Sequence, residues 1–381
     1  MLFETPSLGS RELEIVSQVE GLKEQLRWQL QEPRRWVGSL RRLSFARNIQ
    51  GSNSIEGYEA ALDDAAAVAV GEEPLDASEE TRLALAGYRD AMTFVLQLST
   101  DPHFSYSEQL LKSLHFIMTG YDLKNRPGQW RTGSTFVQRE ETGELVHEGA
   151  DIGRVPELMA ELSTTLNGPP EGLPAIVHAG MAHLNLVMIH PFRGGDGRMA
   201  RCLQSLVLAR QGVLAPVFMS IEEYLGKDTT AYYDVLAEVG DGSWQPGRDA
   251  RPWVRFVLTA HLRQARTVLQ RVKESERLWL KLEALVAAHS ISDRTITALF
   301  DAALGMRVRR ATYRANVEQA GEEMSEQAAT RDLKQLTDVG LLVPQGEKRG
   351  RVYVGGPDIR RLREEMFNER AARDDTDPFA G

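Results

Sequence analysis

The residues with the clearest chemical potential form one short stretch, from His190 to Arg201. It reads His-Pro-Phe-Arg-Gly-Gly-Asp-Gly-Arg-Met-Ala-Arg, so twelve residues hold a histidine, a glycine-rich turn and two arginines near the end. Backbone N–H groups in such a turn, at the start of a helix, favour anions. Arg198 and Arg201 are three residues apart, so both side chains can project to one side of that helix. The stretch therefore predicts a polyphosphate cradle with His190 in the place of a general base.

Two apolar helical patterns must position this stretch. One precedes it, within 175–189, and another follows it through Leu203, Leu206, Val207 and Leu208. The glycines then lie on a tight connection between two buried helices. Such a connection can hold the histidine and the arginines at fixed places.

At these residues the chain resembles the Fic family, whose signature is H-P-F-x-(D/E)-G-N-G-R-x-x-R. Seven of the nine fixed or restricted positions match in order and without gaps. The resemblance implies transfer of AMP from ATP to a hydroxyl of a target Ser, Thr or Tyr, with His190 taking the proton and Phe192 anchoring the loop. It also implies a phosphate-binding set, namely Gly195, Asp196, Gly197, Arg198 and Arg201.

Two positions depart from the signature. Gly194 stands where the family has an acidic residue that binds magnesium, and Asp196 stands where it has asparagine. Three interpretations follow. In the first, Asp196 binds the magnesium from a shifted position. In the second, its carboxylate weakens ATP binding by repelling the phosphates. In the third, the site accepts another phosphate-containing donor.

A second motif lies far upstream, at Ser52, Glu56 and Gly57. Taken alone, Ser52 and Glu56 indicate a capped helix start after a break at Gly51. Beside the main motif, the three residues resemble the family's inhibitory signature, (S/T)-x-x-x-E-(G/N). That resemblance implies that Glu56 pairs with Arg201 and removes the group that should hold the ATP γ-phosphate. The sequence leaves both interpretations open.

The segment from Pro127 to His147 has the period of a β-hairpin, with a turn predicted at 141–144. It resembles the flap of the Fic family, which lies over the active site and pairs with an extended segment of the target. A surface hairpin without a role is the alternative. His115, in a predicted helix just before it, is interpreted as a packed or solvated residue.

The C-terminal part predicts several short helices followed by a basic hairpin, an order that resembles a winged helix. Ser325 to Thr337 takes the place of the recognition helix. From Arg307 to Arg351 there are nine Lys and Arg residues against seven Asp and Glu, so the excess of positive charge is modest. DNA binding is one interpretation; dimerisation, target docking and simple packing are the others.

Composition limits the remaining classes. The 381 residues exceed one typical core, and the net charge of −9 argues against a surface that binds nucleic acid throughout. The single cysteine, Cys202, fits a reducing compartment. No apolar run approaches about 20 residues, and Met1 to Glu20 lacks the features of a signal peptide, so we expect no membrane contact and a cytoplasmic protein.

We therefore expect a mainly α protein with a Fic helical core, a β-hairpin flap and a C-terminal winged-helix-like domain. The expected divisions are an N-terminal helical region with the inhibitory segment (1–75), the Fic core (76–273), the winged-helix-like domain (274–365) and a disordered tail (366–381). The expected function is an autoinhibited protein adenylyltransferase using ATP and magnesium. The alternative is a catalytically weakened, nucleotide-sensing regulator that binds DNA. A second copy of the chain is a further candidate partner.

Overall fold

The computed structural model describes residues 1–31, 35–138, 145–212, 216–347, 350–370 and 374–380. The fold is mainly helical with two small sheets, as expected. Before the motif stand α1 (Ser10–Gln31), α2 (Arg35–Ser54), α3 (Leu62–Ala69), α4 (Glu79–Leu98), α5 (Glu108–Thr119) and α6 (Val155–Asn167). The motif joins α7 (Ala175–Ile189) to α8 (Asp196–Arg210), and after it come α9 (Pro216–Met219), α10 (Glu222–Lys227), α11 (Thr229–Gly240) and α12 (Arg251–Ala288).

The central helix is α7, which is apolar on nearly every side. Every residue from Ile176 to Ile189 is buried, as expected for a helix without a polar face. It packs on α6, α8 and α12, and the indole N–H of Trp253 donates to the carbonyl of Gly180 at 2.8 Å. This packing fixes the point at which the motif begins.

The break predicted at Gly51 is wrong, because α2 continues to Ser54. A glycine inside a helix costs about 1 kcal/mol relative to alanine. Here the missing side chain lets two helix backbones touch, since a Cβ on Gly51 would lie 2.5 Å from the carbonyl oxygen of Glu222. Packing against α10 therefore explains both the glycine and the uninterrupted helix.

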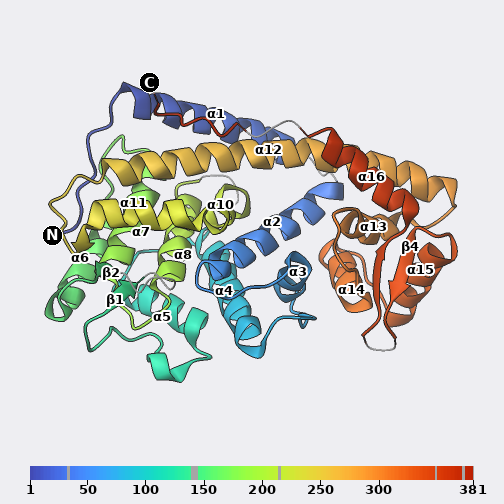
Figure 1. The fold of residues 1–381 in the computed structure, drawn as a ribbon, viewed down its shortest axis with the longest axis horizontal. Helices are drawn as coiled ribbons and strands as arrows, with labels where there is room; N and C mark the ends of the chain where they lie inside the picture. Colours follow the sequence, from blue (N-terminus) through green and yellow to red (C-terminus); the bar gives the residue numbers. More distant parts are fainter. Residues whose placement is uncertain (32–34, 139–144, 213–215, 348–349, 371–373, 381) are drawn as a thin grey trace.

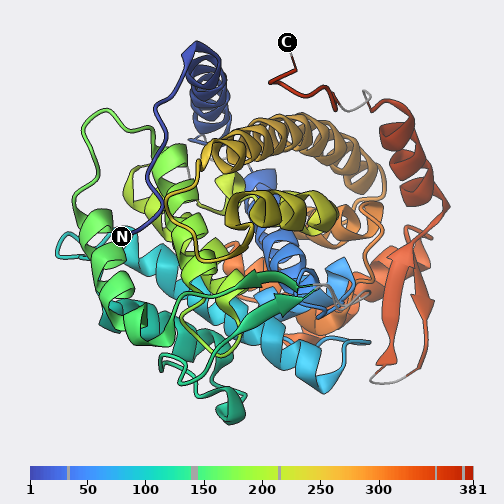
Figure 2. The same ribbon diagram turned by 60° about the vertical axis from the view of Figure 1, so that its left-hand side comes forward.

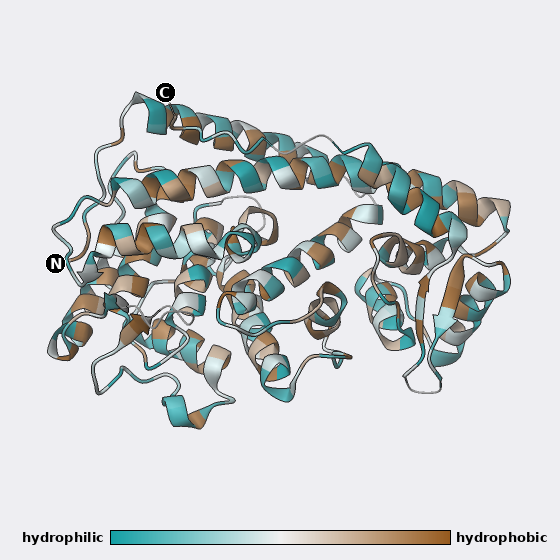
Figure 3. Ribbon diagram, viewed as in Figure 1, coloured by the Kyte–Doolittle hydropathy of each residue, from teal (hydrophilic) through white to brown (hydrophobic). Residues whose placement is uncertain are grey.

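The boundary expected at residue 274 falls inside a helix. The sequence predicts one helix ending near Val272 and another beginning near Leu278, but α12 runs through both for 38 residues. No glycine or proline interrupts it after its first turn, so the change in composition is not a break. The helix α12 is amphipathic, and hydrophilic and hydrophobic colours alternate along it in Figure 3. In Figure 1, α12 spans the molecule from the core to the C-terminal region. No helix in the described ranges is both long and apolar enough to cross a membrane.

The predicted hairpin is present as β1 (Phe136–Gln138) and β2 (Leu145–Glu148), paired antiparallel. A third short strand, β3 (Gly242–Ser243), pairs parallel to β2, so β1 is the edge of the sheet. In Figure 2 the hairpin lies in front of the helical core. The predicted turn at 141–144 lies outside the described residues.

The C-terminal region has the expected order of elements: α13 (Ile296–Ala303), α14 (Arg310–Gln319), α15 (Glu326–Asp338), and the antiparallel pair β4 (Leu342–Gln345) and β5 (Val352–Gly355). A helix that the sequence analysis does not predict, α16 (Pro357–Asn368), follows. The Ser325 side chain caps α15 by accepting the Ala328 N–H at 3.1 Å. The winged-helix assignment stays a prediction.

The end of the chain differs from the disordered tail expected for 366–381. Residues 366–368 complete α16, and 374–380 run back along α1 and α12 (Figure 1). Arg266 pairs with Asp374 at 2.6 Å, and Arg11 donates to the carbonyl of Pro378 at 2.8 Å. These contacts account for the ordered path of a polar segment.

Candidate active site

The motif loop is held between two left-handed residues. His190 ends α7 with φ 52° and donates its N–H to the Leu186 carbonyl at 3.0 Å. Gly195, with φ 81°, precedes the first residue of α8, so the first N–H groups of α8 face the loop. A non-glycine residue at positive φ is uncommon and is maintained by its surroundings. The loop is thus a fixed turn that leads directly into the start of α8, as the sequence indicates.

Phe192 anchors the loop from inside. Its side chain is fully buried and stacks on the His115 ring at a centroid distance of 3.7 Å. The Gly128 N–H donates to Nδ1 of His115 at 2.9 Å, so Nε2 carries the proton and donates to the Gly194 carbonyl at 2.8 Å. Burial lowers the pKa of His115, which keeps it neutral. The prediction of a packed histidine is correct, and its packing holds the motif loop.

Arg131 fastens the start of the same loop. Its backbone N–H donates to the Pro191 carbonyl at 2.9 Å, and its Nε donates to the His190 carbonyl at 2.8 Å. The same guanidinium reaches the carbonyl of Ala150 beside the hairpin. The segment that leads into β1 and the motif are therefore one connected unit.

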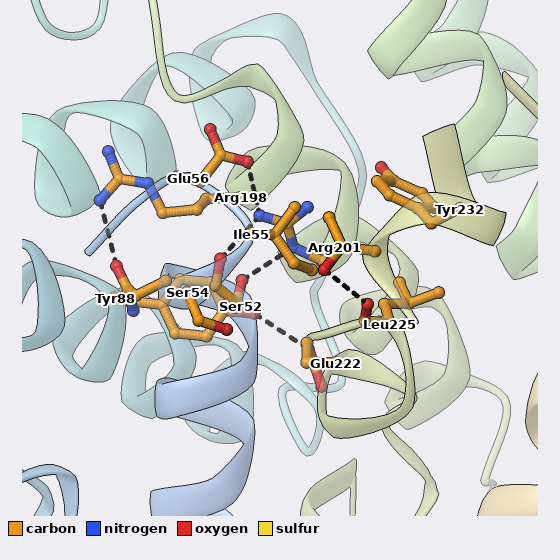
Figure 4. A network of polar contacts seen from close by, with 12 residues as sticks. Ser52, Ser54, Ile55, Glu56, Tyr88, Arg198, Arg201, Glu222, Leu225 and Tyr232 are labelled. Carbon is orange, nitrogen blue, oxygen red and sulfur yellow. Dashed lines mark hydrogen bonds and ion pairs between the residues drawn. The ribbon is translucent and has the colours of Figure 1, made fainter. Parts of the chain in front are cut away.

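At the far end of the cradle, Arg201 meets the inhibitory segment (Figure 4). Its Nη2 donates to Oε1 of Glu56 at 2.7 Å and to the Ser52 carbonyl at 2.8 Å, and its Nε donates to the Ser52 hydroxyl at 2.9 Å. The Arg201 side chain is 1% exposed and that of Glu56 23%. Ser52 lies inside α2, so the alternative of a helix cap at Ser52 is wrong.

The charge on Glu56 is stabilised in place. Burial would raise the pKa of its carboxyl, but the guanidinium groups of Arg201 and Arg198 outweigh burial and hold that pKa below its usual range. Glu56 is therefore ionised at neutral pH. Its negative charge is paired with the buried guanidinium of Arg201.

The absence of a side chain at Gly197 leaves space for the Glu56 carboxylate. A Cβ at position 197 would clash with Oε1 of Glu56. The glycine of the motif thus permits a close approach to the start of α8, which the Glu56 carboxylate uses here. Gly57 follows α2 in a turn with φ 81° and does not line the site.

Arg198 is held by neutral groups. Its Nη1 lies 3.4 Å from Oδ1 of Asn53 and from the Tyr121 hydroxyl, and its guanidinium lies 5.0 Å from the centre of the Tyr58 ring. Its side chain is buried. Arg198 has no ion pair within the described part of the chain, so its charge remains available to an anion.

Asp196 turns toward the histidine. Its Oδ1 accepts the Phe192 N–H at 2.9 Å, and its Oδ2 lies 3.2 Å from Nε2 of His190, with the Asp196 side chain fully buried. Nδ1 of His190 lies 3.3 Å from the Val187 carbonyl. Both ring nitrogens of His190 therefore lie close to acceptor oxygens, and Nε2 faces the Asp196 carboxylate.

The residues present do not form a magnesium site in this arrangement. Only Oδ1 of Asp196 accepts a hydrogen bond among the described residues, Oδ2 is buried without one, and Gly194 has no side chain to supply a further ligand. No group of three His, Cys, Asp or Glu side chains suited to a metal ion occurs in the ranges that the structure describes. Magnesium prefers several oxygen ligands in octahedral geometry.

One cavity of about 280 Å³ joins these parts. Of the residues that the sequence singles out, His190, Gly195, Asp196, Gly197, Arg201 and Glu56 line it. Tyr232 and Tyr233 of α11 and His147 of β2 line it as well, and the Tyr233 hydroxyl donates to the Ile55 carbonyl at 3.4 Å. Burial lowers the pKa of His147 to about 4, so His147 is neutral at pH 7. The two tyrosines supply the aromatic wall of the cavity.

Comparison with known proteins agrees with this geometry. Residues 105–208 match the family described as Fic/DOC. A protein adenylyltransferase Fic from Nematostella vectensis is 26% identical over 225 residues, which covers 56% of this chain and 46% of that relative. One from Culex quinquefasciatus is 40% identical over 80 residues, 21% of this chain and 14% of the relative. The matched segments thus span less than half the length of these relatives.

Solved structures show the same fold. A Fic family protein from Desulfovibrio desulfuricans G20 superposes with a TM-score of 0.58 at 22% identity, covering 93% of this chain and 98% of that one. Fic-1 (residues 134–508) from C. elegans superposes with a TM-score of 0.53 at 22% identity, covering 69% and 73%. With the motif between α7 and α8 and the matched segment around it, this chain is a member of the Fic/DOC family, related to protein adenylyltransferase Fic.

Proposed function

We propose that this chain is an autoinhibited protein adenylyltransferase that transfers AMP from ATP to a hydroxyl side chain of a target protein. The observation that carries the proposal is the Glu56–Arg201 pair, 2.7 Å long, at the far end of a cradle whose near end holds His190. The kinship with protein adenylyltransferases supports the reaction class.

In this reaction the target oxygen attacks the α-phosphorus of ATP. A new P–O bond forms, the bond to the bridging oxygen of the β-phosphate breaks, and pyrophosphate leaves with its electron pair. His190 takes the hydroxyl proton once its Nε2 is free of Asp196. The N–H groups at the start of α8, with Arg198 and Arg201, offset the charge on the phosphates.

The hairpin supplies a place for the target. Because β1 is the edge of its sheet, its free backbone groups can pair with an extended segment. The Phe136 side chain is exposed and also lines the cavity. A Ser, Thr or Tyr on that segment would then face His190.

Glu56 supports inhibition by charge and by position. A desolvated carboxylate on Arg201 leaves the γ-phosphate without that guanidinium and repels it. A surface ion pair would be too weak for this, but Arg201 is almost fully buried. Release of Glu56 is therefore the step that admits ATP.

The test is protein labelling with ATP labelled at the α-phosphate, using the wild type, Glu56→Gly, His190→Ala and the double variant. We expect labelling of the chain itself or of proteins in an added lysate with Glu56→Gly alone, and its loss in the double variant. Equal labelling with and without His190 would overturn the assignment of the base.

A second candidate is a regulator that binds nucleotide without transferring it, with DNA bound by its C-terminal region. The His190–Asp196 contact favours it, because it withdraws the base. Tight ATP binding by Glu56→Gly without any labelling would select this candidate over the first.

A further inference from the structure

A second cavity, of about 450 Å³, lies on the other side of the inhibitory helix α2. Arg47, Gln50, Gly51 and Ser54 line it and share one face of α2 at helical spacing. Ser52, on the opposite face, contacts Arg201. In Figure 1, α2 runs between the core helices and the C-terminal region. The helix α2 thus separates the motif from this cavity.

Cations outnumber carboxylates around this cavity. Five line it, namely Arg47, Lys227, Arg271, Arg363 and Arg370, against the carboxylates of Glu59 and Glu223. Arg271 binds both oxygens of Glu223 at 2.6 Å, and Lys227 shares that carboxylate. Arg370 is bound by Glu274 from outside the cavity.

Two of the cations remain poorly neutralised. Arg47 lies 3.9 Å from Glu223, at the limit of an ion pair, with its side chain 16% exposed. Arg363 has no ion pair among the residues that the structure describes, and its guanidinium lies 5.5 Å from the centre of the Phe367 ring. Burial and the neighbouring Arg271 lower the pKa of Arg47 to about 10, so Arg47 keeps its charge at neutral pH. An anion would relieve this excess of charge.

The remaining wall is apolar. Leu304 of α13 and Met366 and Phe367 of α16 line the side facing the C-terminal region. A cationic wall beside an apolar wall matches a phosphate group attached to a small organic body. Inorganic phosphate would use only the cationic half.

We propose that this cavity binds a small organic phosphate, and that its occupancy holds α2 and the inhibitory segment in the closed position. The second part rests on the proposed function. A Cβ on Gly226 would lie 2.7 Å from the Gly51 carbonyl, so α2 and α10 are in backbone contact. A ligand that joins Arg47 of α2 to Arg363 of α16 stabilises this arrangement relative to any in which α2 moves.

The binding test uses calorimetry with phenyl phosphate and inorganic phosphate. We expect the wild type to bind phenyl phosphate more tightly, and Arg363→Gln to bind it about tenfold more weakly. Arg361→Gln removes the same charge from the same helix at a residue outside the cavity, and should bind as the wild type does. Arg198→Gln should also retain binding, which separates this cavity from the motif. Equal binding by Arg363→Gln and wild type, or no binding by the wild type, would refute the site.

The coupling test measures ATP binding with and without phenyl phosphate. Saturating phenyl phosphate should weaken ATP binding by the wild type about fivefold or more, and should have no effect on Arg363→Gln. In Glu56→Gly it should still bind but leave ATP affinity unchanged. Binding without any effect on ATP in the wild type would refute the coupling. Absence of ATP binding in every variant would instead count against the proposed function and leave the calorimetric result standing.

Discussion

The motif helix α8 and the C-terminal helix α15 were both candidates to face a polyanion, and they differ in how their cations are held. In α8, neutral groups hold Arg198. Among the residues that the structure describes, Arg201 has one ion-pair partner, Glu56, which comes from a distant segment. In α15, Lys334 pairs with Asp338 of the same helix. Asp332, also in α15, holds Arg294 through two hydrogen bonds of 2.7 and 2.9 Å.

This comparison shows that the number of basic residues on or near a helix does not by itself predict an anion-binding site. Cations with carboxylates on the same or a neighbouring helix are neutralised locally, as Glu326 of α15 does for Arg310 and Arg314 of α14. Under the proposed function, a cation whose carboxylate comes from a distant segment exchanges that carboxylate for a ligand when the segment is displaced. The following variants test this distinction.

Glu56→Gly should have the largest effect. Removal of the carboxylate should raise ATP affinity by roughly a hundredfold or more, since a like charge ~4 Å away costs on the order of 4 kcal/mol at an effective dielectric of about 20. Calorimetry with ATP, with and without magnesium, measures it. Glu171→Gly, at an exposed position in a turn outside both cavities, is the matched control. If both variants bind ATP like the wild type, Glu56 is not what closes the cradle.

Glu222 is the second carboxylate near Arg201, and it has no cationic partner among the described residues. It accepts from the hydroxyls of Tyr88 and Ser205 at 2.9 and 3.0 Å (Figure 4 shows its place), and burial raises its pKa from 4.5 to about 7. The folded protein therefore binds more protons than the unfolded chain between these pH values. This carboxyl costs stability progressively as the pH rises from about 4.5 to about 7.

Glu222→Gln should remove that loss. At pH 8 its free energy of unfolding should exceed that of the wild type by about 2 to 3 kcal/mol, and the difference should shrink toward pH 4. Denaturant unfolding at both pH values measures it. A difference that is independent of pH would mean that Glu222 does not titrate in this range.

Asp196→Asn should have a smaller effect, seen best with Glu56→Gly already present. An asparagine does not place a charged oxygen 3.2 Å from Nε2 of His190 as the carboxylate does, so Nε2 should be freed as a base. We expect the single-turnover labelling rate to rise about tenfold. A fall in rate would show that Asp196 assists the reaction.

The smallest effect is expected in α15. Double-stranded DNA should bind weakly to this helix, with a shallow dependence on salt, because most of the cations on and near α15 are already paired. Arg331→Gln, at an exposed position of α15, should change that binding by less than about twofold. Filter binding across a salt series measures it. A steep salt dependence of DNA binding that is reduced in Arg331→Gln would establish a DNA-binding surface and contradict the distinction drawn between α8 and α15.

The parts of the site that the sequence could predict are those set by residue type within a short stretch. His190, the glycines and both arginines lie together because one turn carries them. The pair of Glu56 and Arg201 was implied by the resemblance of Ser52, Glu56 and Gly57 to the family's inhibitory signature. His115 and Arg131 could not be assigned a role, because each holds backbone carbonyls of a loop far away in sequence. The periodicity of hydrophobic residues along the sequence does not indicate such a contact.

The errors in the fold have the same origin. Gly51 has the local signature of a break, yet a distant backbone at α10 makes it part of a helix. The polar tail has the composition of disorder, yet Arg266 and Arg11 bind it. The role of Asp196 toward a metal ion or phosphates stays a prediction, and its contact with the His190 ring could only be placed by the fold.

The length of α12 has a consequence for synthesis of the chain on the ribosome. In Figure 1, α1 lies along α12, and Glu12 of α1 pairs with Arg255 of α12 at 2.8 Å. The buried side chains Ile15, Val19 and Leu26 of α1 therefore emerge long before the helix that covers them has been translated. For that period the nascent chain exposes an apolar stripe, which makes it a candidate for chaperone binding.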